Sequence, residues 1–141
     1  MTNNRLAASY IDKARKRLKA LDVLFSEGAY SDVIREAQEI VELALKAALR
    51  SVGVEPPKIH DVGRLIEEHQ TRFSSEFQTS TRRLAEISAW LRKEREFAFD
   101  GDIDFIPTEQ YSPDQGERAL NNARFVVDVV GRLRDATSSG G

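Results

Sequence analysis

The arginine at position 95 is the residue whose placement points most directly to chemistry. Between Leu84 and Ala98, apolar and small residues recur at the three- and four-residue spacing of a buried helix face, and Arg95 falls on the same stripe. The arginines of a helix normally face solvent, so an arginine that faces the core needs a polar partner or a functional role. Two roles suit a guanidinium there: an internal tie that fixes the register of packed helices, or the binding of phosphate.

Acidic residues on two segments are candidate partners for Arg95. Glu42 lies in the narrow charged strip of an otherwise apolar helix, where it also stands in favourable i,i+4 order with Lys46. Asp100 begins an acidic turn at the end of the Arg95 helix, a place that opposes the helix dipole unless Arg92 and Arg95 absorb the charge. We therefore expect a ligand-binding groove or an ion-pair cluster built from Arg95, Arg92, Lys46 and Glu42.

Other kinds of site find little support. The chain has no cysteine, which excludes a disulfide framework, a thiolate metal site and a cysteine nucleophile. No glycine-rich phosphate loop and no serine-hydrolase nucleophile motif occurs. His60 and His69 point to opposite faces of one helix, and the acids of 100–104 meet Phe105 and Tyr111 where a calcium loop needs glycine and glutamate. We expect no metal and no cofactor.

Helices must position these residues. No run of alternating β-branched residues indicates a sheet, whereas apolar residues recur with helical spacing through most of the chain. We therefore expect an all-α fold, an antiparallel bundle of four long helices plus one short accessory helix. The expected helices are Asn4–Ser26, Asp32–Val52, the short Asp61–Gln70, Glu76–Phe99, and a last helix that begins at Ser112.

Local signals mark the ends of these helices. Gly28 and Gly53 are good stops, and Asp61 is a good cap for the short helix. The last helix opens with a cap, a proline and a glutamine over 112–115, which is the pattern of a capping box. The second helix is apolar around most of its circumference, so we expect it to lie at the centre of the bundle.

Length and composition fit one ordinary globular domain. The 141 residues are 40% hydrophobic and 31% charged, with a net charge of −2. We expect a single domain over residues 1–135 and a disordered tail over 136–141. The near-neutral charge gives no global basic field of the kind nucleic-acid binders often carry. No apolar run resembles a secretory signal or a membrane span, which favours a cytoplasmic protein that does not bind membranes.

The order of several motifs resembles the HEPN superfamily of prokaryotes and higher eukaryotes. The similarity runs from about Leu6 to Leu133 and is most specific in the glutamate-leucine-alanine-leucine-lysine string of residues 42–46. It also rests on residues 30–33, which lead into that string, on the segment 59–62, on Arg95 near a helix end and on the opening of the last helix at 111–114.

The resemblance implies a bundle of four to five helices that dimerises and has a nucleotide- or RNA-related role. Many such proteins act with a minimal nucleotidyltransferase as a toxin–antitoxin-like pair. In catalytic members an arginine is followed, after four to six residues, by a histidine, and two protomers form a metal-independent ribonuclease centre. Arg95 resembles that arginine, but Asp100, Gly101 and Asp102 occupy the positions where the histidine would stand.

Three functions remain open from the sequence. The first is a binding module, a homodimer that binds nucleotide, RNA or a nucleotidyltransferase-type partner through Arg95. The second is an endoribonuclease that uses Arg95 with Asp100 or His60, although His60 also fits a local role beside the helix cap. The third is a purely structural partner subunit in which Arg95 is an internal tie. Trp90 and Phe97 lie off the main stripe of their helix and are candidates for the dimer contact.

Overall fold

Every regular element that the structure describes is helical. The computed structural model describes residues 2–56, 58, 61–99 and 111–140. No strand occurs in these ranges, so the expected all-α class is confirmed. The elements in chain order are α1 (Thr2–Ser26), α2 (Tyr30–Ser51), α3 (Val62–Glu68), the 3₁₀ helix η1 (Gln70–Arg72), α4 (Ser75–Gln78), α5 (Thr81–Phe99) and α7 (Pro113–Gly140).

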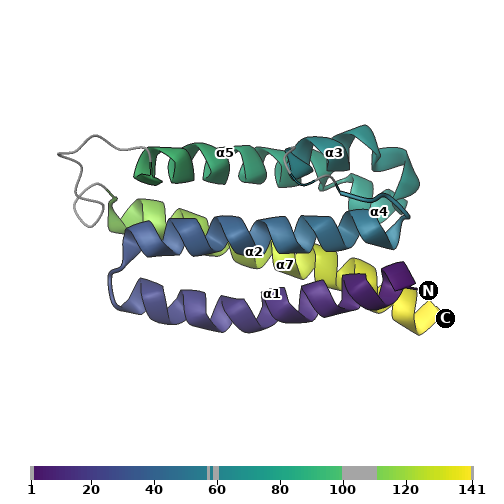
Figure 1. Ribbon diagram of the computed structural model, residues 1–141, viewed down its shortest axis with the longest axis horizontal. Coiled ribbons are helices and arrows are strands. Elements are labelled where there is room, and N and C mark those ends of the chain that lie inside the picture. The colour runs from purple at the N-terminus through teal and green to yellow at the C-terminus, as the bar shows by residue number, and fades with distance from the viewer. Residues whose placement is uncertain (1, 57, 59–60, 100–110, 141) are drawn as a thin grey trace.

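Four long helices, α1, α2, α5 and α7, lie side by side with alternating direction (Figure 1). α1 and α5 run one way along the bundle, and α2 and α7 run the other way. The short helices α3 and α4 gather beside the start of α5, near the end of α2. The antiparallel bundle with a short accessory region therefore matches the architecture expected from the sequence.

α2 is the central helix, as its apolar circumference predicts. It packs against α1, α3, α5 and α7, so almost every direction around its axis meets another helix. Burying a Leu or Ile side chain of this kind contributes about 1.5–3 kcal/mol relative to exposure, which makes α2 the main source of core stability. Its buried residues are Val33, Ile34, Ala37, Gln38, Ile40, Val41, Ala44, Leu45, Ala47, Ala48 and Leu49.

The expected helix ends are confirmed in four places. Gly28 and Gly53 follow α1 and α2 with φ angles of +72° and +79°, a left-handed conformation that favours glycine. Asp61 caps α3 through its Oδ1, which accepts hydrogen bonds from the backbone N–H groups of residues 63 and 64. Ser112 and Gln115 form the reciprocal capping box, with distances of 3.2 and 2.9 Å.

The long helix expected over Glu76–Phe99 is interrupted, and this part of the prediction is wrong. The segment instead contains α4, a break at Thr79 and Ser80, and α5 from Thr81. The Thr79 hydroxyl donates to the carbonyl of Glu76 at 2.6 Å, and the Thr81 hydroxyl donates to the carbonyl of Gln78 at 3.1 Å. Such short-range bonds to the backbone compete with helix continuation, which explains the break.

α3 packs closely on α5 because residue 63 is glycine. A Cβ atom placed on Gly63 would lie 2.8 Å from Cβ of Ser88 and 3.0 Å from Cα of Ala85. Ser88, a small residue on the apolar stripe of α5, is 2% exposed at this contact. The close approach places the start of α3, with Asp61, beside the middle of α5.

The last helix, α7, continues to Gly140, since no proline or glycine interrupts residues 132–139. The domain limit at residue 135 remains a prediction. None of the helices in the described ranges is both long enough and apolar enough to span a membrane.

Candidate binding site around Arg95

Arg95 reaches from the last turns of α5 to the first half of α2. Its Nη1 donates a hydrogen bond to Oε1 of Gln38, and its Nη2 lies 3.4 Å from Oε1 of Glu39. The expectation that Glu42 is its partner is therefore wrong. The antiparallel crossing of α5 and α2 brings the end of α5 to an earlier turn of α2 (Figure 1). The other expected partner, Asp100, lies outside the described residues.

Gln38 is a buried amide that the sequence analysis did not single out. Its relative exposure is 4%, within a helix face that is otherwise apolar. A buried amide requires hydrogen-bond partners, and the Arg95 guanidinium supplies one. The signal that would have found it is the polar side chain at position 38 between the apolar residues Ala37 and Ile40.

Glu39 links three helices through one carboxylate. Its Oε2 accepts a hydrogen bond of 2.7 Å from Nη2 of Arg17 on α1, while its Oε1 faces Arg95 on α5. Nε of Arg17 also donates to Glu36, at 2.6 Å. Among the described residues, two arginines and two glutamates thus form a network of balanced charge, which we call the Arg95 network: Arg17, Glu36, Gln38, Glu39 and Arg95.

The electrostatics around Arg17 favour its charged form. The hydrogen bond to Glu36 is the largest influence on Arg17 and raises its pKa, against an opposing contribution from desolvation. Side-chain exposures of 30% for Arg17 and 32% for Arg95 place both guanidinium groups at the edge of the bundle. An arginine that is oriented by protein acceptors and still reaches solvent is a suitable group for phosphate binding.

Arg92 lies one helical turn before Arg95 and has a different partner. Its Nη1 lies 3.3 Å from Oδ2 of Asp61, whose other oxygen caps α3. The Asp61 carboxylate therefore joins the start of α3 to α5. The structure does not place Arg92 in the Arg95 network.

Glu42 and Lys46 do not form the ion pair that the sequence predicts. Both are partly buried on α2, and no described side chain makes an ion pair or hydrogen bond with either. Since they follow Glu39 by three and seven residues, they continue the same face of α2 away from Arg95. Their proposed role in ligand binding remains a prediction.

Tyr111 links the start of α7 to the end of α5 through a hydrogen bond. Its hydroxyl donates to the backbone carbonyl of Glu94 at 2.6 Å, and the residue is 5% exposed. Desolvation and, after it, the Glu94 charge raise the Tyr111 pKa above the usual 10.0. The hydrogen bond restrains the backbone directly before Arg95, a role that the sequence analysis did not foresee.

Trp90, a candidate for the dimer contact, is partly buried and lies under an arginine of α7. The guanidinium carbon of Arg118 is 4.1 Å from the centre of its ring, within the range of a cation–π contact. A second pair, Arg83 over Phe125 at 3.8 Å, joins the same two helices. The side chain of Phe97 lies outside the described ones, so its part in dimerisation remains a prediction.

No described contact brings a histidine to Arg95. His60 lies outside the described ranges, and His69 ends α3. Within the described ranges, no cluster of His, Asp and Glu side chains is able to hold a metal ion. The described part of the site is therefore an arginine network without an accompanying proton donor such as histidine.

Comparison with known proteins identifies one family. The model of the HEPN domain matches residues 7–133, which is nearly the whole chain and includes every member of the Arg95 network. No curated protein and no solved structure matches the sequence. The chain belongs to the HEPN domain family.

Proposed function

We propose that this HEPN protein is a non-catalytic binding module, a homodimer that binds a phosphate group of a nucleotide or RNA through Arg95. The proposal is supported by the orientation and the exposure of the Arg95 side chain. Gln38 and Glu39 orient its guanidinium, while about a third of the side chain, 32%, stays exposed. A phosphate that approaches from solvent meets an arginine whose orientation is already fixed.

The phosphate replaces the carboxylate of Glu39 in this proposal. The Arg95–Glu39 distance of 3.4 Å lies at the long end for a charge-assisted hydrogen bond, and both side chains are about one-third exposed. Phosphate oxygens form shorter bonds with the same guanidinium. Because the chain carries a net charge of −2, we expect modest affinity that falls as salt rises.

The absence of a histidine after Arg95 supports binding over catalysis. The family resemblance implies a histidine after a gap of four to six residues, and this chain has Asp100, Gly101 and Asp102 at those positions. An aspartate with an ordinary pKa is ionised at neutral pH and is a poor general acid. A ribonuclease that uses Arg95 with Asp100 or His60 is therefore the second candidate.

Three variants test the proposal by titration with labelled nucleotides and short RNA strands. Arg95→Ala should weaken binding at least about tenfold, because a charge-assisted hydrogen bond contributes about 1.5–3 kcal/mol. Glu39→Gln should strengthen binding, since it removes the carboxylate that competes with phosphate. Arg82→Ala is the matched control, because Arg82 is an exposed arginine of α5 paired only with Glu86. Equal affinity for all three variants would refute the site.

A purely structural role for Arg95 is supported by the charge balance of its network. In that case Arg95→Ala and Glu39→Gln both lower stability, and neither nucleotide nor RNA binds to the wild type. A nucleotidyltransferase-type protein would then be the partner of the module. Co-purification from native extract, with bound nucleotides and bound proteins both analysed, separates the two possibilities. Sedimentation at micromolar concentration tests the homodimer.

A further inference from the structure

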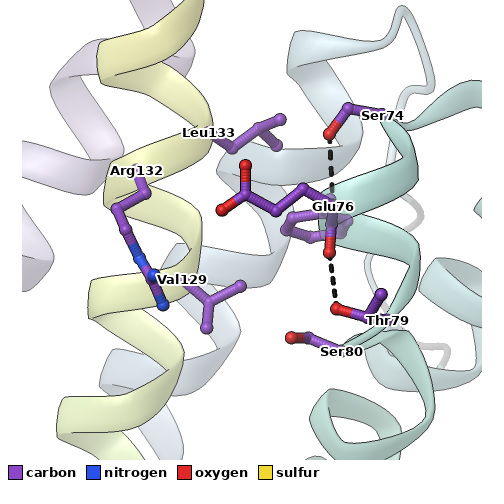
Figure 2. A pocket seen from close by; sticks show the side chains of 8 residues that line it. Ser74, Glu76, Thr79, Ser80, Val129, Arg132 and Leu133 are labelled. Carbon is purple, nitrogen blue, oxygen red and sulfur yellow. Dashed lines mark hydrogen bonds between the residues drawn. The ribbon is translucent and has the colours of Figure 1, made fainter.

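A second candidate site lies at the other end of the bundle. A pocket of about 330 Å³ opens between α4, the first residue before α5 and the second half of α7 (Figure 2). Arg95 follows Thr81 by 14 positions, which corresponds to about 21 Å of helix, so this pocket is distinct from the Arg95 network.

The α4 side of the pocket carries the solvent-exposed carboxylate of Glu76. Figure 2 shows the Glu76 side chain extending across the pocket toward α7. No described side chain or backbone group forms a hydrogen bond or ion pair with this carboxylate. The Ser80 hydroxyl also faces the pocket and is likewise without a partner among the described groups. By contrast, the hydroxyls of Ser74 and Thr79 are engaged in local backbone bonds.

The α7 side of the pocket carries Arg132, whose side chain lies along α7 in Figure 2 and is only weakly held there. Arg132 pairs with Asp128 at 3.1 Å within the same helix, and the two side chains are 62% and 66% exposed. Ion pairs this exposed contribute little to stability and exchange readily. No ion pair joins Arg132 to Glu76 across the pocket in the described structure.

An apolar surface lies between the two charges. Phe77 is buried at 3% exposure and Val129 at 6%, and Leu133 completes the lining. The pocket thus offers a negative group on one wall, a positive group on the other and an aliphatic and aromatic surface between them. A ligand that satisfies all three has an ammonium group, a carboxylate group and an apolar side chain.

We propose that this pocket binds a small zwitterion with an apolar side chain, an amino acid or a dipeptide. The ligand ammonium donates to Glu76, and the ligand carboxylate accepts from Arg132 and Ser80. The apolar side chain covers Phe77, Val129 and Leu133. The volume of 330 Å³ has room for either length of ligand.

Calorimetric titration of the full chain with four probes tests this assignment. Leucine and leucyl-leucine carry both charges, isopentylamine lacks the carboxylate, and N-acetyl-leucine lacks the ammonium group. We expect at least one zwitterion to bind at or below about 10 mM and both single-charge analogues to bind at least about tenfold more weakly. Whichever of leucine and leucyl-leucine binds more tightly shows whether the pocket prefers an amino acid or a dipeptide. No binding by either zwitterion, or equal binding by all probes, would overturn the proposal.

Variants locate the binding site. Glu76→Gln and Arg132→Gln should each weaken zwitterion binding about tenfold or more, because each removes one charged contact. Glu86→Gln and Arg82→Gln make the same changes in an exposed i,i+4 pair outside the pocket and should leave binding unchanged. Circular dichroism confirms that every variant stays folded. Unchanged binding in both pocket variants places the ligand elsewhere and refutes the site.

Discussion

A hydrogen bond between the Arg95 guanidinium and the Gln38 amide oxygen joins α5 to α2. Gln38 is one of three polar side chains buried in the described core, with Thr81 and Ser88. A buried amide without a partner costs about 1–3 kcal/mol. The hydrogen bond therefore explains why Arg95 lies on an apolar stripe and why the polar Gln38 lies in an apolar helix.

The first prediction concerns the coupling of these two residues. Arg95→Ala should lower the free energy of unfolding by about 1–3 kcal/mol, because it removes a hydrogen-bond donor to the buried Gln38. In the double variant Arg95→Ala/Gln38→Leu, the loss should be smaller than the sum of the single losses, by about 0.5–3 kcal/mol. Urea unfolding followed by circular dichroism measures all three variants. Strict additivity would show that the hydrogen bond contributes nothing of its own.

The second prediction concerns ribonuclease activity. Purified wild type and Arg95→Ala should cleave RNA at the same background rate in EDTA, because no histidine follows Arg95 at the family's spacing. EDTA chelates divalent metal ions and so inhibits contaminating metal-dependent nucleases. Cleavage by the wild type that disappears in Arg95→Ala would establish the catalytic alternative and direct attention to Asp100 and His60.

The third prediction follows from the raised pKa of Tyr111. Since its pKa in the folded state lies above the unfolded value of 10.0, the folded protein holds this proton more tightly. The resulting contribution to stability is complete below pH 10.0 and is lost as the pH rises through the folded-state pKa. Tyr111→Phe should therefore be less stable than wild type at neutral pH, and the difference should shrink in alkaline solution. A constant difference between melting temperatures across this range contradicts the assignment.

The sequence predicted the fold more fully than the site. Helical periodicity, the glycines at helix ends and the Asp61 cap are local signals, so α1, α2, α3 and the start of α7 could be read directly. The break at Thr79 and Ser80 was missed because it depends on hydroxyl groups that turn back to nearby carbonyls.

The partners of Arg95 depend on which turn of α2 the end of α5 crosses. Periodicity indicates the face on which Glu39 and Glu42 lie, but it does not choose between residues one turn apart. That choice is made by packing, including the approach of α3 to α5 at Gly63. Arg17 was missed for the same reason, since its contact with Glu39 joins residues 22 positions apart.

The fourth prediction compares two glycines in helices. Gly63→Ala should destabilise the protein by about 1–3 kcal/mol, because the added Cβ meets the Ala85 backbone at 3.0 Å. Gly131→Ala is the matched control. The three atoms nearest to its Cβ all belong to the end of the Arg15 side chain, which is 40% exposed and able to move. The control should be neutral or slightly stabilising, since alanine favours a helix over glycine. Equal losses for both variants would show that the close approach of α3 and α5 is unimportant.

The fifth prediction separates the two roles of Asp61. Its Oδ1 caps α3, and its Oδ2 pairs with Arg92 at 3.3 Å. Asp61→Asn keeps a capping oxygen and removes the charge, so it should change stability by less than about 1 kcal/mol, the upper range for an exposed ion pair. Asp61→Ala removes both contacts and should cost about 1 kcal/mol more than Asp61→Asn. Chemical unfolding of the two variants and of Arg92→Ala distinguishes the contributions. If Asp61→Asn and Asp61→Ala are equally destabilised, the ion pair with Arg92, and not the cap, fixes the start of α3.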